Sequence, residues 1–127
     1  MRRTLESIRD RMDSVGVLLS GLCAVHCVLS VVLVGVLGLG GQLLLRPEIH
    51  EIGLAMAVAI GAVSLGFGLL RHGRPEPIVL GGCGLGLMAS ALFVDHGPME
   101  AALTIAGVAL VATAHIRNVR SHLHGSA

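Results

Sequence analysis

Four apolar segments, each close to the length needed to cross a lipid bilayer, dominate the 127-residue chain. A helix spans the hydrocarbon core with roughly 17–25 residues, and the segments cover residues 15–39, 50–70, 78–94 and 99–116. Hydrophobic residues make up 54% of the chain and charged residues 13%, whereas soluble domains carry about a quarter charged residues. The sequence therefore predicts one all-α domain over residues 1–127, an integral membrane four-helix bundle with residues 117–127 as a flexible tail.

Arginine is distributed unevenly between the connections, and the chain has no lysine. Four arginines precede the first segment, two lie in the connection 71–77 and two follow the last segment, while Arg46 lies in the connection 40–49. The positive-inside rule places arginine-rich ends in the cytoplasm. Both termini are therefore predicted to be cytoplasmic, in a multi-pass protein of the bacterial inner membrane. The first segment is longer than the apolar region of a signal peptide, about 7–15 residues, so it is expected to persist as a helix.

Small and polar residues share one face of several predicted helices at the 3.6-residue period. In the second helix this face carries His50, Gly53, Ala57, Gly61, Ser64 and Gly68. Small residues let membrane helices approach closely, so this face, together with Gly82 and Gly86, is predicted to pack against other helices. The same glycine-rich faces offer a surface for a second copy, and a homodimer is expected.

The segment Cys23-Ala24-Val25-His26-Cys27 is the sharpest chemical feature of the sequence. Residues four apart in a helix are neighbours on one face, so both thiols lie together near the centre of the first span with His26 beside them. Thiolate and neutral imidazole bind soft and borderline ions such as Hg²⁺, Cu⁺ and Zn²⁺. The pattern predicts a metal site, and packing alone is the alternative because buried cysteine is often a small hydrophobe.

A second group of polar residues flanks the outward ends of the predicted helices. His50 and Glu51 open the second helix, and Asp95, His96 and Glu100 surround the last turn. Carboxylates at helix starts have ordinary capping and dipole roles. Converging from two connections, these residues would also form an acidic, imidazole-bearing mouth that concentrates cations.

The order of these groups along the helices predicts that the ion moves inward by ligand exchange, from the mouth to the cysteines. Candidates for its release lie toward the cytoplasmic end. They are Asp13, His72, Cys83 and His115. His115 continues the polar face of the last helix and is expected about 10 Å below the cysteines at about 1.5 Å per residue. This spacing predicts that His115 binds the ion in a separate step and does not share one site with the cysteines.

Other classes of function find less support in the sequence. A net charge of +1 without a basic, aromatic-rich surface excludes an electrostatic case for nucleic acid. No nucleophile, base and orienting partner occur together, so an enzyme is not expected, and no cofactor is expected beyond the transported ion. Two alternatives stay open: a haem-binding electron-transfer protein using His26 with His115 or His50, and a structural or partner-binding role.

The combined pattern resembles the MerC family of mercury-resistance membrane proteins. The resemblance rests on four short helices, Asp13-x-x-Gly16, Cys23-x-x-His26-Cys27, His50-Glu51 and the terminal His115. It implies that Cys23 and Cys27 receive mercuric ion, with His26 beside them, and pass it toward a cytoplasmic metal acceptor. A thiol-to-thiol relay would need a second pair of cysteines at the cytoplasmic end, where this chain has only Cys83.

Zinc is the alternative ion. Two thiolates suffice for a linear Hg²⁺ site, whereas zinc takes four ligands in a tetrahedron. Cys23, His26 and Cys27 supply at most three ligands, so a fourth would have to come from another helix or subunit, with His50 and Glu100 as candidates.

Overall fold

Four helices form an antiparallel bundle in the computed structural model, which describes residues 1–38 and 45–125, with side chains placed as far as residue 121. The helices are α1 (Arg2–Ser30), α3 (Pro47–His72), α4 (Glu76–Ala91) and α5 (Pro98–Gly125), and a π-helical segment, η1 (Val31–Val36), continues α1. The described residues contain no strand. The predicted all-α membrane bundle is confirmed.

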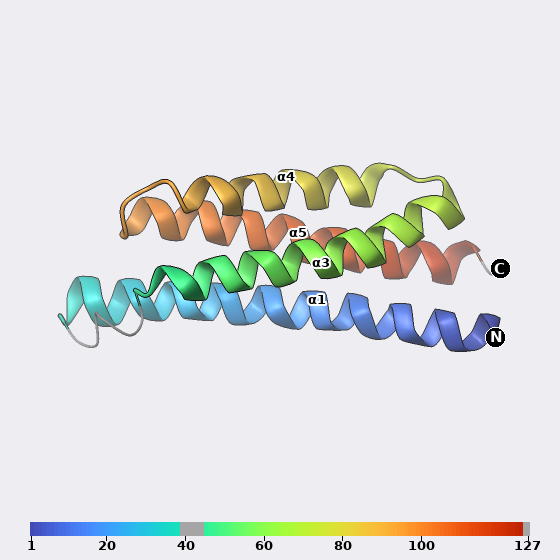
Figure 1. Ribbon diagram of the computed structural model, residues 1–127, viewed down its shortest axis with the longest axis horizontal. Helices are drawn as coiled ribbons and strands as arrows, with labels where there is room; N and C mark the ends of the chain where they lie inside the picture. The colour runs from blue at the N-terminus through green and yellow to red at the C-terminus, as the bar shows by residue number, and fades with distance from the viewer. Residues whose placement is uncertain (39–44, 126–127) are drawn as a thin grey trace.

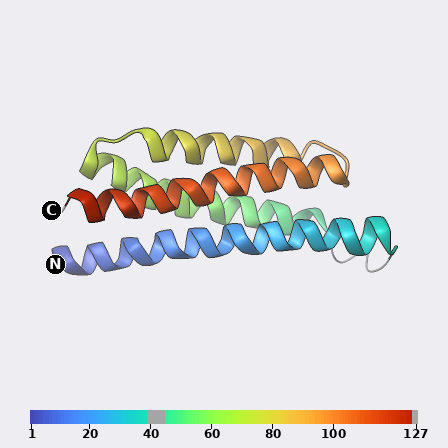
Figure 2. The ribbon, with the colours of Figure 1, turned by 180° about the vertical axis from the view of Figure 1, so that it is seen from behind.

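Both chain termini and the connection between α3 and α4 lie at one end of the bundle (Figure 1 and Figure 2). The turn between α4 and α5 lies at the opposite end, near η1 and the start of α3. Helix α5 contacts each of the other three helices. The arginine-rich parts of the chain therefore share one end, as the positive-inside reading requires, and the cytoplasmic location of that end remains a prediction.

Three helices are long and apolar enough to cross a membrane, namely the continuous helix Arg2–Val36, Pro47–His72 and the helix that begins at Pro98. Helix α4 has 16 residues, about 24 Å at 1.5 Å per residue, and is a shorter apolar helix. Large apolar side chains project outward, including Leu22, Phe67 and Phe93, which are 59%, 61% and 92% exposed. Lipid covers such surfaces in a membrane protein.

The helices differ in length from those predicted. Helix α1 begins at Arg2 and not at 15, because the polar segment before the apolar run buries Arg9 and Asp13 against the bundle. Helix α5 continues to Gly125, so the predicted helix end at 116 is wrong; Asn118, one turn beyond it, is buried. The predicted end of the first helix at 39 and most of the first connection lie outside the described residues.

Proline and glycine set the limits of α3. Pro47 occupies the first turn, where the missing N–H costs no hydrogen bond, and Arg46 before it is extended. The helix ends at Gly73, which adopts a left-handed conformation with φ of 62°. Its N–H donates to the carbonyl of Leu69 at 2.8 Å. A glycine at this position is the usual means of ending a helix.

Close backbone contact between α4 and α5 depends on two glycines. A Cβ on Gly84 would lie 2.6 Å from the carbonyl oxygen of Gly107, and a Cβ on Gly107 would lie equally close to that of Gly84. The small face of α3 is likewise buried at Ala57, Gly61, Ser64 and Gly68, as predicted. Gly82 and Gly86 do not pack within the bundle, because both are exposed with open space beside them; the glycines of α4 that pack there are Gly81 and Gly84.

Candidate metal centre

Helix α1 holds the cysteine motif on one face, directed toward α3 and α5. The Cys27 residue is 3% exposed, while Cys23 and His26 are half-buried. Both cysteines, and the exposed Cys83 on α4, are free thiols. The structure thus keeps the two thiols of the motif one turn apart and inside the bundle, as the spacing predicts.

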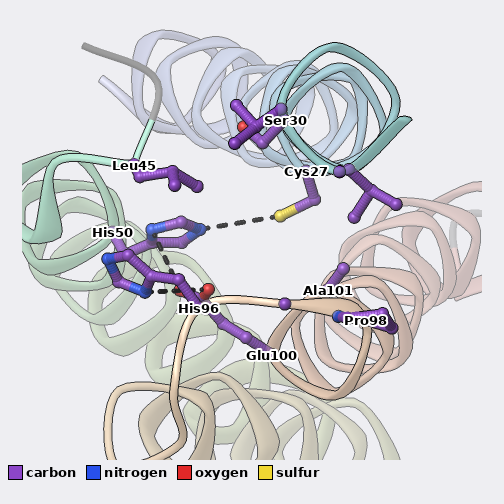
Figure 3. Close-up of a pocket in the computed structure, with 12 residues that line it drawn as sticks. Cys27, Ser30, Leu45, His50, His96, Pro98, Glu100 and Ala101 are labelled. Carbon is purple, nitrogen blue, oxygen red and sulfur yellow. Dashed lines mark hydrogen bonds and ion pairs between the residues drawn. The ribbon is translucent and has the colours of Figure 1, made fainter. Parts of the chain in front are cut away.

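A cavity of about 110 Å³ lies beside Cys27 at the end of the bundle opposite the termini (Figure 3). Its polar lining comes from three parts of the chain: Cys27 of α1, His50 of α3, and His96 and Glu100 around the start of α5. Apolar residues of η1 and α5 complete the wall. Such a volume holds several water molecules, which is ample room for a metal ion.

The polar side chains of this cavity form a continuous series of contacts (Figure 3). The Nδ1 atom of His96 lies 3.0 Å from Oε2 of Glu100, and the other carboxylate oxygen lies 3.4 Å from Nδ1 of His50. Across the ring, Nε2 of His50 lies 3.6 Å from Sγ of Cys27. His50 therefore faces Glu100 with one nitrogen and Cys27 with the other.

The series leads from a partly exposed side chain, His96, to a buried one, Cys27. The side chain of His96 is 33% exposed, that of His50 13% and that of Glu100 7%, and Cys27 is more deeply buried still. The donors are arranged in sequence and not around a common point: no three His, Cys, Asp or Glu side chains among the described residues form a ready metal-binding group. The geometry suits an ion that moves between successive pairs of ligands.

His26 adds an unused donor atom next to this series. Its ring packs edge-on against His50, with 5.4 Å between the ring centroids. Within the described part of the chain, the buried Nε2 of His26 has no hydrogen-bond partner. A buried polar atom without a partner is costly, and an imidazole nitrogen in that state is available to a metal ion.

The π-helical segment η1 forms part of the cavity wall through Val31, Val34 and Gly35. The N–H of Leu37 donates to the carbonyl of Val32 at 3.2 Å, five residues back. Widened turns of this kind occur often at functional sites. The apolar sequence of η1 gave no indication of it, since its pattern is that of an ordinary membrane helix.

Two residues predicted for the mouth lie elsewhere. Glu51 and Asp95 are exposed and do not line the cavity. Glu51 follows His50 by one position, which turns its side chain by about 100° around the helix. Of the mouth residues, the structure brings together His50, His96 and Glu100 around one cavity, which Glu51 does not line; a metal-binding role for Glu51 stays a prediction.

His115 belongs to a second polar cluster, farther along the bundle toward the termini. Its Nδ1 lies 2.6 Å from Oδ1 of Asp13 and 3.4 Å from Oγ of Ser64. Asn118 donates from Nδ2 to the other Asp13 oxygen at 3.0 Å and to the carbonyl of Ser64 at 3.3 Å. The four residues are at most 2% exposed and join α1, α3 and α5. The sequence pointed to Asp13 and His115 separately; it missed Ser64 and Asn118 as their partners.

Gly16 makes room for the His115 ring. A Cβ at this position would lie 2.5 Å from Nε2 of His115. Asp13 and Gly16 therefore both accommodate His115: the carboxylate contacts the imidazole, and the missing Cβ of the glycine leaves space for the ring. The one clue in the sequence is that Asn118 follows His115 by three residues, which places both on the same helix face.

Opposite effects are expected from alanine at two glycines of α1. Gly16→Ala should destabilise the protein by about 1–3 kcal/mol, since it overpacks the buried His115 site. Gly21→Ala, which meets no atom within 4 Å, should instead stabilise the helix by about 0.5–1 kcal/mol. Unfolding in mixed detergent checks both variants, and equal effects would contradict the packing described for Gly16.

The two polar clusters are separated by a tightly packed layer. The space between them is about 10 Å³ and is lined by Cys23, Gly16 and His115 together with apolar side chains that include Met88 and Val111. A volume of this size admits about one water molecule. Cys23 and His115 thus both border this narrow space, and the separate step predicted for His115 stays a prediction.

Comparison with known proteins identifies the family. A family model described as MerC mercury resistance protein matches residues 13–120, which include the cysteine motif, the cavity residues and the cluster around His115. No curated protein and no solved structure matches the chain. Together with the apolar helices, this match establishes that the chain belongs to the MerC family of mercury-resistance membrane proteins.

Proposed function

We propose that the protein binds mercuric ion at Cys23 and Cys27 and carries it inward across the bacterial inner membrane by ligand exchange. The observation that supports this most directly is the series of contacts that ends at the Cys27 thiol, 3.6 Å from His50. Membership of the MerC family supports mercury as the ion. Ionisable residues inside a membrane are costly and tend to mark ion paths.

Capture begins at the cavity mouth in this proposal. The partly exposed His96 ring and the buried Glu100 carboxylate meet the ion first, and the carboxylate compensates part of its charge. His50 then receives the ion, because its Nδ1 faces Glu100 and its Nε2 faces Cys27. Each transfer exchanges one ligand for another nearby, so the ion is never left without a donor in the apolar interior.

The cysteine pair is the proposed resting site. Soft thiolates are the preferred ligands of mercuric ion, and two of them suffice for a linear complex. Each thiol loses its proton when it binds the ion. Nε2 of His50 faces Cys27 and accepts the proton of that thiol. The unpartnered Nε2 of His26, which lines the same groove as Cys23, accepts the proton of Cys23.

Release toward the termini requires the packed layer below Cys23 to open. The space of about 10 Å³ there holds about one water molecule, too little for a hydrated ion. The cluster of Asp13 and His115 lies directly beyond this layer and would supply the next donors. A cytoplasmic thiol acceptor then completes the transfer, so the protein itself performs no redox or hydrolytic step.

Zinc is the second candidate ion, because the cavity combines thiol, imidazole and carboxylate donors, which are all zinc ligands. A tetrahedral site would need four of them around one point. His50, however, directs its two nitrogens to opposite sides, toward Glu100 and toward Cys27. The arrangement therefore supports the two-coordinate mercuric ion over zinc.

A homodimer is proposed through α4. Gly82 and Gly86 form a G-x-x-x-G pair, and both are exposed with nothing within 4 Å of an added Cβ. Pairs of this type let two membrane helices approach closely. The proposed contact lies on the shortest helix of the bundle, whose length of 16 residues leaves it the least able to span the bilayer alone.

Replacing Glu100 by glutamine should slow uptake without removing the cysteine site. The substitution removes the charge between His50 and His96. Loss of such a supporting ligand lowers metal affinity or activity about 10–100-fold. The initial rate of mercuric-ion uptake should fall by that factor while binding to the thiols stays close to wild type. Glu51→Gln, on the exposed neighbour of His50, is the matched control; equal loss in both variants would contradict the proposed path.

A further inference from the structure

A second, larger groove lies between α1 and α3 at the end of the bundle that holds both termini. It has a volume of about 430 Å³, and it is far along α1 from the cysteine motif. Its walls are apolar, formed by Leu5, Ile8 and Met12 of α1 and by Val63, Phe67 and Leu70 of α3. Two arginines, Arg9 and Arg71, complete the lining.

Arg9 lies in this groove with unused hydrogen-bonding capacity. The residue is 6% exposed, and its buried Nε atom has no hydrogen-bond partner within the described part of the chain. Its contact with the Asp10 carboxylate, at 3.7 Å, is too long for a hydrogen bond. A guanidinium carries five N–H donors in a fork that matches phosphate oxygens, and a buried N–H without an acceptor, such as that of Nε, is costly.

Arg71 lies at the rim of the same groove. It forms an ion pair with Glu6, and both side chains are about two-fifths exposed, at 42% and 41%. Because α1 and α3 are antiparallel, Arg71 lies beside the first turns of α1 and Arg9 lies about one turn deeper. Beyond them Met12 and Val63 continue the apolar groove toward the middle of the bundle.

We propose that this groove binds one anionic phospholipid. The phosphate accepts hydrogen bonds from Arg9 and Arg71, and an acyl chain lies along the apolar side chains toward Met12. Basic pockets between helices near a membrane surface are suited to anionic headgroups. Leu5, Phe67 and Leu70 are 60%, 61% and 84% exposed, and only an amphipathic ligand satisfies both these side chains and the buried guanidinium.

Charge complementarity favours a lipid over a second copy of the chain as the occupant. Two copies joined at this groove would place the Arg9 side chains near each other, and like charges repel at short range; Arg71, already paired with Glu6, would not relieve this repulsion. Free phosphate would leave the apolar walls uncovered. A lipid with a net negative headgroup meets both requirements, and its binding does not depend on the identity of the transported metal.

Native mass spectrometry of the full-length protein, released from detergent after titration with a defined lipid, tests this proposal. Wild type should retain one phosphatidylglycerol in preference to phosphatidylcholine. Arg9→Gln should weaken phosphatidylglycerol binding about tenfold, since a charge-assisted hydrogen bond is lost. Arg11→Gln, which alters an exposed arginine two positions along the same helix, should stay within about twofold of wild type because a surface charge contributes little.

A second variant keeps the test decisive if Arg9→Gln does not fold. Leu70→Glu places a carboxylate on an exposed position of the groove and should also weaken phosphatidylglycerol binding about tenfold. Phe93→Glu, at a residue that is 92% exposed in the turn between α4 and α5, is its control. Equal binding of the two lipids, or equal effects of variant and control, would overturn the proposal. Displacement of the lipid by millimolar inorganic phosphate would overturn it in favour of a simple anion site.

Discussion

Replacing Cys23 and Cys27 together by serine is expected to weaken mercuric-ion binding by the purified protein more than about a hundredfold. Loss of a supporting residue around a metal commonly costs about 10–100-fold in affinity, and here both soft ligands themselves are removed. Serine keeps the size of each side chain, so the bundle should stay intact. The hydroxyl is a hard, protonated donor that cannot replace a thiolate for a soft ion.

Competition titration against a chelator of known affinity measures this effect, with a non-thiol reductant present to keep the cysteines reduced. Cys83→Ser is the matched control, because this third free thiol is exposed on α4. The control should bind one mercuric ion with the affinity of wild type. Undiminished binding in the double variant would place the site among the histidines and Glu100 at the mouth and contradict the proposed role of the cysteine pair.

The largest loss of stability is expected from Asp13→Ala. The carboxylate of Asp13 is fully buried and lies within hydrogen-bonding distance of His115 and Asn118. Its removal leaves His115 and Asn118 buried with only their longer contacts to Ser64, at 3.4 and 3.3 Å, and breaking a buried pair in this way costs about 3–5 kcal/mol. Because the cluster joins α1, α3 and α5, its loss should also loosen the packing of these helices at the end of the bundle that holds both termini.

Unfolding of the purified variants in mixed detergent measures this prediction. Asp10→Ala removes a carboxylate three residues earlier that is 55% exposed and loosely paired with Arg9, so it should change stability by less than about 0.5 kcal/mol. Hydrogen exchange at the start of α1 should rise in Asp13→Ala and stay unchanged in Asp10→Ala. Similar stability of the two variants would show that the cluster around His115 does not stabilise the packing of α1, α3 and α5.

The helical bundle could be predicted from the sequence because apolar length and breaker positions are local properties. Pro47 and Gly73 limit α3 close to the expected residues, and the i, i+4 spacing of Cys23 and Cys27 fixes their common face in any helix. The predicted convergence of His50, His96 and Glu100 also follows from adjacency at one end of the bundle. These inferences need only the period of the helix and the order of the segments.

Contacts between distant helices could not be predicted in the same way. Nothing in the local pattern indicates that Asn118 donates a hydrogen bond to Asp13, or that the ring of His115 packs against Gly16. Helix α1 also starts well before its apolar part, since Arg9 and Asp13 are buried by α3 and α5 and not by lipid. The side-chain direction at the start of α3 could not be predicted for the same reason: His50, and not its neighbour Glu51, lines the cavity.

The most direct test of the proposed function is uptake of mercuric ion by proteoliposomes that contain a trapped thiol-based fluorescent indicator. Wild type should load the vesicles much faster than protein-free controls, Cys23→Ser/Cys27→Ser should return uptake to the control rate, and Glu100→Gln should lie between them. Uptake by the double-serine variant at the wild-type rate would contradict transport through the cysteine pair, whatever ion the cavity binds.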